Sequence, residues 1–342
     1  MTETQKAPKV VWVISDGVPG HYNQSKGVLF ALSQHYQLDV HWIELKLSKP
    51  FLRRPLAWLL NKSIPSLSKL SHFYQGDALA AQRPDVVIGA GGNSAYAIAW
   101  ISRAYQAKNI FCGSLRHLKA ELFDAILVLE PDMPAPFISL KVSPVALDQT
   151  VLQQQAEQWR KEHPDVEHKL WSMLIGGDGA GAEYTDEDWI NLAKQMNLVA
   201  RQQGIKWLLS TSRRTGAAAE KLLQQYLNFE YIADVVWWSE VPRTVLHQFI
   251  AVSDRVYCGA DSMSMMMESL TAMRPLVVYH PAKFQPDEKF SQVLHRLSSE
   301  RYINVRYLTQ LSHSDAEDLT LKALEYSPSL QLAQYFEDRL FS

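Results

Sequence analysis

Short apolar runs alternate with longer stretches of helical periodicity along the first part of the chain. The runs predict strands at residues 10–15, 38–45, 85–89, 109–113 and 124–130. Helices are expected at 21–34 and up to Tyr105, the second capped by Asn93 or Ser94. Because strands that alternate with helices form parallel sheets covered on both faces, residues 1–150 are predicted to form a doubly wound, Rossmann-like α/β domain.

The same alternation restarts after a polar, Gln-rich segment at 151–163, which is predicted to be a helix crossing between domains. The expected strands are 168–175, 205–211, 255–259 and 275–279, and the expected helices are 186–203, 242–252, 262–273, 315–326 and 329–341. The pattern predicts a second Rossmann-like domain over 151–325 that faces the first across a cleft. A C-terminal helix within 326–342 is expected to pack back on the first domain.

Charge and composition narrow the classes of function. Lys and Arg total 34 against 36 Asp and Glu, so the formal charge is −2 and a basic field for nucleic acid is lacking. Cys112 and Cys258 lie far apart without metal-ligand spacing, which predicts buried thiols in a reducing compartment. The apolar run at 10–14 is too short for a signal peptide or a membrane span. We expect a soluble, cytoplasmic protein that uses no metal and no cofactor.

Three loops at the expected strand ends of the second half could hold an anion. They are glycine-rich at 176–182 and rich in hydroxyl or basic residues at 210–215 and 259–264. Ligands of open α/β sheets bind at the carboxyl ends of strands, where helix N-termini and guanidinium groups attract phosphate. A diphosphate-sized substrate group is therefore expected at these loops, and its candidate ligands are Gly176, Gly177, Ser212, Arg213, Arg214, Asp261, Ser262 and Ser264.

Glu268 lies six residues after Ser262, between the first and second turns of the expected helix. A carboxylate there could accept two hydrogen bonds from the hydroxyls of a ribose. Alternatively, Glu268 is a structural carboxylate that interacts with the helix dipole or caps the helix, as in a capping box.

The first half has its own candidate site, at the turn that runs from Asp16 and Gly17 to Gly20 and His21. His21 could take a proton from an acceptor hydroxyl, with Asp16 orienting it, or Asp16 could act directly. Alternatively, Asp16 only caps the turn and His21 is a solvated residue.

A second loop of the first half, formed by Gly91, Gly92 and Asn93, is expected to face substrate. It departs from the dinucleotide fingerprint because Ser94 stands at the last glycine position, which argues against a nicotinamide enzyme. Walker and H-E-x-x-H motifs are absent as well.

The segment 51–70 combines bulky apolar residues with Arg53, Arg54, Lys62 and Lys69 and contains no acidic residue. This composition suits an interfacial patch for anionic lipid. It suits equally a helix packed on the domain surface, and Pro55 and Pro65 interrupt the helical pattern.

Several of these motifs together resemble the mitochondrial-fission "elongated mitochondria" family. The resemblance rests on WVISDG at 12–17, LSTSRRT at 209–215 and FIAVSDRVYCGADSMSM at 249–265, followed by Glu268 and Pro275. Bacterial members of that family are similar to this chain in length.

The resemblance implies a two-Rossmann-domain plan of the glycosyltransferase type called GT-B. It implies a metal-independent transferase that moves a sugar from a nucleoside-diphosphate-sugar on the carboxyl domain to a lipid-linked or lipopolysaccharide acceptor of the cell envelope. Peripheral contact with the inner membrane through 51–70 is expected. In the 176–182 loop an aspartate stands where related transferases have a hydroxyl residue. A nucleotide-sugar epimerase or hydrolase on the same fold stays open, as does a non-catalytic scaffold like the plant members that recruit a fission GTPase.

Overall fold

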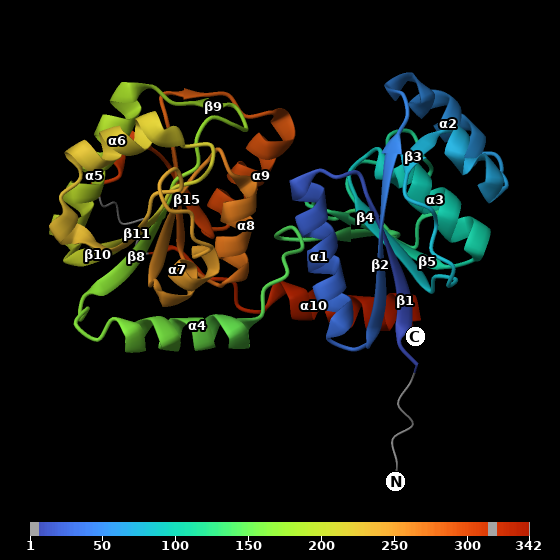
Figure 1. The fold of residues 1–342 in the computed structure, drawn as a ribbon, viewed down its shortest axis with the longest axis horizontal. Helices are drawn as coiled ribbons and strands as arrows, with labels where there is room; N and C mark the ends of the chain where they lie inside the picture. The colour runs from blue at the N-terminus through green and yellow to red at the C-terminus, as the bar shows by residue number, and fades with distance from the viewer. Residues whose placement is uncertain (1–6, 314–319, 342) are drawn as a thin grey trace, which may run out of the picture. The chain divides into compact units, whose positions relative to one another are not determined.

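The computed structural model describes residues 7–313 and 320–341. These residues form two compact units (Figure 1). Unit 1 comprises 7–146 and 328–341, and unit 2 comprises 147–313 and 320–327. Each unit is an α/β domain built on its own mainly parallel sheet.

The sheet of unit 1 has seven strands in the order β3-β2-β1-β4-β5-β6-β7. Neighbouring strands are parallel except for the β2–β3 pair. The central strands are buried on both faces, which explains their nearly uninterrupted apolar sequence. The strands are β1 Lys9–Ser15, β2 Leu38–Leu47, β3 Tyr74–Gly76, β4 Val86–Ala90, β5 Lys108–Cys112, β6 Ala125–Val128 and β7 Phe137–Ser139.

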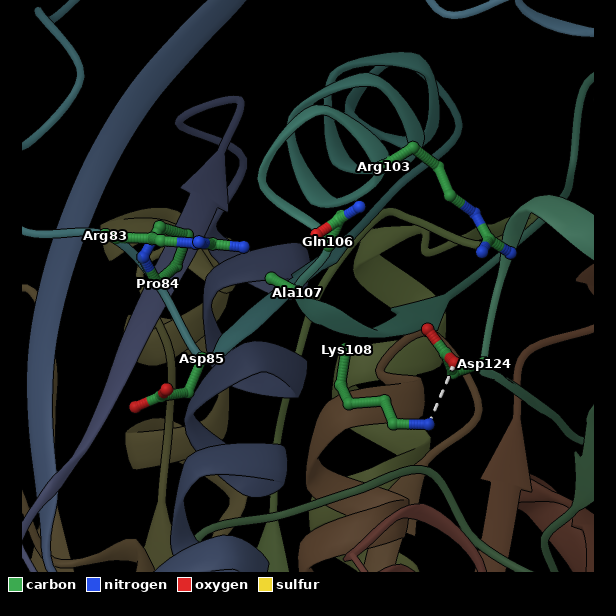
Figure 2. Close-up of a pocket in the computed structure, with 8 residues that line it drawn as sticks. All are labelled: Arg83, Pro84, Asp85, Arg103, Gln106, Ala107, Lys108 and Asp124. Atoms are coloured by element: carbon green, nitrogen blue, oxygen red, sulfur yellow. Dashed lines mark hydrogen bonds and ion pairs between the residues drawn. The ribbon is translucent and has the colours of Figure 1, made fainter.

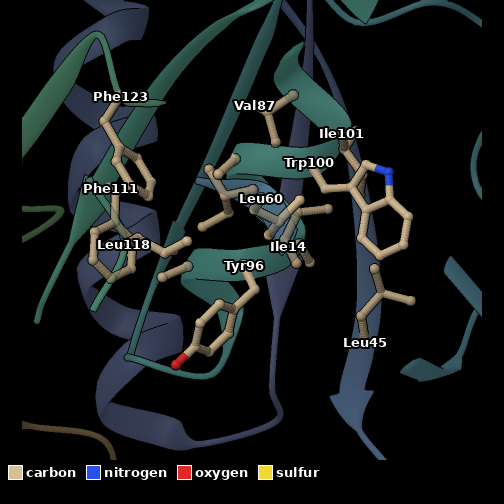
Figure 3. Close-up of a cluster of buried hydrophobic side chains, with 14 of the residues drawn as sticks. Ile14, Leu45, Leu60, Val87, Tyr96, Trp100, Ile101, Phe111, Leu118 and Phe123 are labelled. Carbon is tan, nitrogen blue, oxygen red and sulfur yellow. The ribbon is translucent and has the colours of Figure 1, made fainter. Parts of the chain in front are cut away.

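Helices cover both faces of this sheet. On one face, α1 (Pro19–Ser33) packs together with α10 (Pro328–Phe336), which Figure 1 shows in red. On the other face, α2 (Arg53–Leu60) and α3 (Ser94–Tyr105) enclose the cluster in Figure 3. The C-terminal helix thus belongs to unit 1, and the hydroxyl of Ser329 donates to the carbonyl of Val145 at 3.2 Å.

Unit 2 has a six-stranded parallel sheet in the order β11-β10-β8-β12-β13-β15. A separate antiparallel pair joins β9 (Ala182–Glu183) to β14 (Lys283–Phe284). The main strands are β8 Lys169–Leu174, β10 Ile205–Ser210, β11 Ile232–Val236, β12 Arg255–Gly259, β13 Leu276–His280 and β15 Ile303–Tyr307. The helices are α4 Gln149–Glu162, α5 Asp186–Gln203, α6 Gly216–Tyr226, α7 Leu246–Val252, α8 Met263–Thr271 and α9 Glu288–Ser299.

Both sheets reverse the direction of strand addition at one point. In unit 1 the chain builds outward from β1 through β2 and then restarts at β4 on the other side of β1. In unit 2 it builds from β8 through β10 and restarts at β12. The carboxyl ends of β1 and β4, and of β8 and β12, therefore flank the crevices where doubly wound folds bind ligands.

The helices α6 and α9 and the main strands β11 and β15 of unit 2 were not predicted, and neither was the short pair of β9 and β14. The helix expected from Pro242 begins only at Leu246, because Arg243 is held by Asp234 at 2.7 Å and by the carbonyl of Val235 at 3.0 Å. The helix expected at 315–326 is wrong over 321–326, which is not helical, and its residues 315–319 lie outside the described residues.

Candidate functional sites at the two switch points

The switch point of unit 1 holds a histidine–aspartate pair. Asp16 follows β1 directly, and His21 lies in the first turn of α1. The His21 Nδ1 atom lies 3.0 Å from both carboxylate oxygens of Asp16. One of these oxygens also accepts from the backbone N–H of Val18 at 3.2 Å. Asp16 therefore fixes the turn and the imidazole together, so the two roles weighed from the sequence coexist in the geometry.

The exposure of the pair suits proton transfer. The Asp16 side chain is 10% exposed and that of His21 is 36% exposed. Within the described residues the Nε2 atom of His21 has no hydrogen-bonding partner. An imidazole held at Nδ1 by a carboxylate and open at Nε2 can accept a proton at Nε2.

The loop after β4 is shaped around basic side chains. A Cβ on Gly91 would overlap the His21 ring, and one on Gly92 would overlap the Arg116 side chain. The Oδ1 atom of Asn93 accepts from the Nε–H of Arg53 at 2.9 Å. The Asn93 side chain therefore does not cap α3, because Arg53 engages it, and the hydroxyl of Ser94, the other predicted cap, donates to the carbonyl of Ala90 at 3.0 Å.

The remaining glycines of the unit 1 turn differ in role. Gly17 has a φ of +79°, a left-handed conformation that favours glycine between β1 and α1. Gly20 lies within α1, and a Cβ built there would meet no atom within 4 Å. No neighbouring side chain therefore requires glycine at this position.

The switch point of unit 2 is occupied by the carboxylate of Asp261, whose side chain is 0% exposed. It accepts from the N–H of Gly177 at 3.1 Å, from the hydroxyl of Tyr184 at 3.1 Å and from Arg214 at 2.7 Å. Burial raises the pKa of Asp261, and the charge of Arg214 opposes that rise. A Cβ on Gly176 would overlap this carboxylate, so glycine is required there.

Two expected phosphate or substrate ligands are therefore used inside unit 2. Asp261 is too buried to contact a substrate, which corrects its predicted role. Arg214 pairs with Asp261 and also donates to the carbonyls of Gly177 and Asp178, at 3.3 and 2.9 Å. The physical reason is that a buried carboxylate requires a counter-charge and donors. Arg214 therefore ties the loops after β8 and β12 to the loop after β10.

Three other predicted ligands lie around this ion pair. Ser212 donates to the carbonyl of Gly176 at 3.2 Å, so its hydroxyl serves the loop. The hydroxyl of Ser262 accepts from the N–H of Met265 at 3.5 Å and caps α8. Arg213 is exposed, and no described residue pairs with it. Of the two adjacent arginines, Arg213 is thus the one available to a ligand.

Glu268 lies on α8 and contacts two side chains, the predicted ligand Ser264 and His247, for which no role was predicted. One carboxylate oxygen accepts from the hydroxyl of Ser264 at 2.8 Å, and the other lies 2.9 Å from Nε2 of His247. His247 was missed, because it lies on α7, 21 residues before Glu268, and no sequence motif links the two. The Glu268 side chain is 14% exposed and that of His247 is 41% exposed, so both can be reached from solvent.

Two of the hollows in unit 1 lie at opposite ends of its parallel strands. One, of about 610 Å³, lies at the amino ends of β4, β5 and β6 and contains Arg83, Arg103 and Lys108 (Figure 2). These cations already have partners, since both arginines donate to backbone carbonyls and Lys108 lies 3.4 Å from Asp124.

The other hollow, of about 440 Å³, adjoins the Asp16 turn. It is lined by Ser15, Gly17, Pro19, Tyr22, Asn23, Trp42, Glu44 and Asp77. Tyr22 and Trp42 lie with their ring centroids 4.2 Å apart on one of its walls. The hollow is therefore an aromatic and acidic surface next to the pair of His21 and Asp16.

Over residues 7–313 and 320–341, no three His, Cys, Asp or Glu side chains gather closely enough to hold a metal ion. No helix in the same ranges is both long and apolar enough to span a bilayer.

Comparison with solved structures shows the fold. A Listeria monocytogenes protein assigned as a UDP-N-acetylglucosamine 2-epimerase has a TM-score of 0.55 at 12% identity, covering 97% of this chain and 98% of that one. The S. aureus protein MnaA, solved with UDP, has a TM-score of 0.54 at 11% identity, with 98% of both chains covered. CalG4, the calicheamicin glycosyltransferase, has a TM-score of 0.51 at 10% identity, covering 98% and 94%. The chain has a GT-B-like fold of two Rossmann-like domains.

Sequence comparison shows the family. An uncharacterised protein of Rickettsia prowazekii is 20% identical over 310 residues, covering 80% of this chain and 84% of that protein. The model of the mitochondrial fission ELM1 family matches residues 19–324, which is most of the chain. This chain therefore belongs to the mitochondrial fission ELM1 family.

Proposed function

We propose that this protein is a glycosyltransferase that moves a sugar from a nucleoside-diphosphate-sugar to an acceptor of the cell envelope. The observation that carries the proposal is the cross-linked set of loops at the switch point of unit 2. Three consecutive strand ends are fastened there around Asp261 and Arg214, next to the exposed Arg213. The fold supports it, since solved proteins of this fold include a glycosyltransferase and a protein with UDP.

The N–H of Gly177 already serves the buried Asp261, so in this proposal the donor diphosphate lies against the exposed Arg213 beside the loop after β8. Ser264 and Glu268 contact the ribose, whose hydroxyls can use the acceptor positions of the carboxylate that Ser264 and His247 leave open. Fixed donors of this kind stabilise the negative charge that develops on the leaving diphosphate. Protein groups supply this stabilisation, and a metal ion is not needed for it.

His21 is the proposed base on unit 1. Its Nε2 accepts the proton of the acceptor hydroxyl as the hydroxyl oxygen forms a bond to the anomeric carbon. The bond between that carbon and the diphosphate oxygen breaks, and its electron pair leaves with the nucleoside diphosphate. Asp16 keeps Nδ1 protonated and stabilises the imidazolium that forms.

We propose further that α2 brings unit 1 to the cytoplasmic face of the inner membrane. Phe51 and Trp58 are 69% and 61% exposed, and the Lys62 Nζ atom lies 4.0 Å from the Trp58 ring centroid. Leu56 and Leu60 are buried on the opposite side of the helix. Both sequence interpretations of the segment are compatible with this helix, because one side packs on unit 1 and the other is aromatic and basic.

Calorimetric titration with UDP, GDP, CDP and ADP tests the donor site. One of them is expected to bind below millimolar, equivalent to about −4 kcal/mol, and Arg213→Ala is expected to weaken it about tenfold or more. Absence of binding for all four would refute the proposal and favour a scaffold role.

Product analysis with the donor alone then separates the reaction classes. A transferase leaves the nucleotide-sugar largely intact until acceptor is added. An epimer or free sugar formed without acceptor would instead assign a nucleotide-sugar epimerase or hydrolase.

A further inference from the structure

The loop after β4 seats three basic side chains on three consecutive residues. The His21 ring lies against Gly91, and the Arg116 side chain lies against Gly92. Arg53 is hydrogen-bonded to the next residue, Asn93, through its Nε–H. These side chains come from α1, from the loop after β5 and from α2, so separate parts of unit 1 bring basic side chains to one loop.

Arg116 is held in place through its backbone. The hydroxyl of Tyr96 donates to the Arg116 carbonyl at 3.0 Å, and Figure 3 shows that hydroxyl at the edge of the buried cluster. Arg116 and His117 have φ angles of +48° and +73°, a conformation that costs energy for residues other than glycine. Burial raises the pKa of Tyr96, and the charges of Arg116 and Arg53 oppose the rise, so both guanidinium groups lie near this phenol.

The two guanidinium groups lack an acidic partner within the described residues. Arg214 and Arg243, by contrast, each lie 2.7 Å from a carboxylate oxygen. The carboxylate of Asp16 is engaged by His21, the third basic side chain at this loop. Arg53 is half-buried and Arg116 is exposed, so an anion can approach from solvent. Two unneutralised guanidinium groups at one loop provide the planar donors that bind phosphate oxygens in pairs.

We propose that Arg53 and Arg116 bind a phosphate or diphosphate group next to His21. Within the proposed function, on which this part rests, the anion is the phosphate of the acceptor, and the transferase acts on phosphorylated acceptors. Binding there places the acceptor close to the base. The sequence predicted Arg53 only as part of the basic segment 51–70 and gave no role to Arg116, because the two arginines lie 63 positions apart and only the fold unites them at Asn93 and Gly92.

Calorimetric titration of the full chain with inorganic pyrophosphate tests the site. The titration is made in Arg213→Ala, which removes the proposed contribution of unit 2. Arg53→Gln and Arg116→Gln are each expected to weaken pyrophosphate binding at least tenfold, with little change in the melting temperature. The matched control is Arg83→Gln, which removes the same charge from the hollow in Figure 2.

The outcomes separate this inference from the proposed function. Unchanged affinity in both Arg53→Gln and Arg116→Gln, or a loss only in Arg83→Gln, would overturn the phosphate site. Nucleoside diphosphate binding that depends on Arg213 would still support the donor site. Conversely, pyrophosphate binding that depends on Arg53 and Arg116 supports the phosphate site even if no nucleotide binds.

A second arm distinguishes a lipid-borne phosphate from a soluble one. Vesicles of phosphatidylcholine containing phosphatidic acid are sedimented with the protein in the presence and absence of pyrophosphate. Competition that disappears in Arg53→Gln and Arg116→Gln supports a phosphate on a lipid. If pyrophosphate does not change vesicle binding, and pyrophosphate itself binds through Arg53 and Arg116, the acceptor is a soluble phosphorylated molecule.

Discussion

Replacing Asp261 should cost more stability than replacing any comparable carboxylate at the surface of unit 2. Asp261→Ala removes one charged and two neutral hydrogen bonds from a side chain that is 0% exposed. At about 1 kcal/mol for each neutral bond and about 2 kcal/mol for the charged one, the loss is about 4 kcal/mol. Because the Arg214 side chain is 37% exposed and can be rehydrated, we expect a net loss of about 3 kcal/mol.

Differential scanning calorimetry measures this loss. For a domain the size of unit 2, about 3 kcal/mol corresponds to a fall of roughly 6–12 °C in the melting temperature. The matched control is Asp234→Ala, which breaks the more exposed pair with Arg243 and should cost below about 1 kcal/mol. Equal shifts for the two variants would refute the assignment of Asp261 as the residue that fastens the three loops.

Asp261→Asn separates shape from charge. The amide oxygen can accept from Gly177 and Arg214, and the amide N–H can donate to the hydroxyl of Tyr184, so a loss below about 1 kcal/mol is expected. The folded-state pKa of Asp261 is raised, so the folded protein binds this proton more tightly than the unfolded chain. Protonated Asp261 therefore adds to the free energy of unfolding below the pKa of the unfolded chain. This stabilisation is lost as the pH rises through the pKa of Asp261 in the folded protein. Wild type should show this fall and Asp261→Asn should lack it.

Three further predictions concern other parts of the chain. Gly91→Ala should destabilise unit 1 by about 2 kcal/mol and displace the ring of His21, because the φ of Gly91 is +90° and a Cβ would overlap that ring. An unchanged midpoint of urea unfolding would contradict this prediction. Burial raises the pKa of Cys112 to about 12 and that of Cys258 well above its ordinary value. Native protein at pH 8 should therefore react with a thiol reagent far more slowly than unfolded protein, and rapid labelling of native protein would show that these thiols are not buried. Trp58→Ser should weaken sedimentation with vesicles rich in phosphatidylglycerol severalfold, whereas Phe229→Ser, at a 49% exposed position in unit 2, should have no effect; equal effects would argue against α2 as the membrane surface.

The elements with a clear periodicity were predictable from sequence. The α5 helix, for example, has the predicted bounds 186–203, and Thr185 before it forms a capping box with Asp188. The β11 and β15 strands were missed because they are short and charged or polar residues interrupt their alternation, such as Asp234 and Arg306. Such strands gain their stability from neighbours in the sheet rather than from local propensity.

The candidate sites were predictable only as far as strand ends can be located. Asp16, His21 and the glycines of the loops follow strands that the apolar pattern identifies. The partners of these residues depend on tertiary contacts across long separations. The pairing of Arg214 with Asp261 spans 47 positions, so the sequence could not show that one of the two arginines is already neutralised. For the same reason, the contact of His247 with Glu268 could not be predicted from the sequence.

If the switch point of unit 2 binds a nucleoside diphosphate, a crystal structure with UDP will show the nucleotide there. We expect the diphosphate beside Arg213 at the carboxyl ends of β8 and β12, the ribose hydroxyls at Glu268, and the pair of Asp261 and Arg214 intact. UDP bound elsewhere in unit 2, or Arg213 directed away from its phosphates, would contradict this expectation.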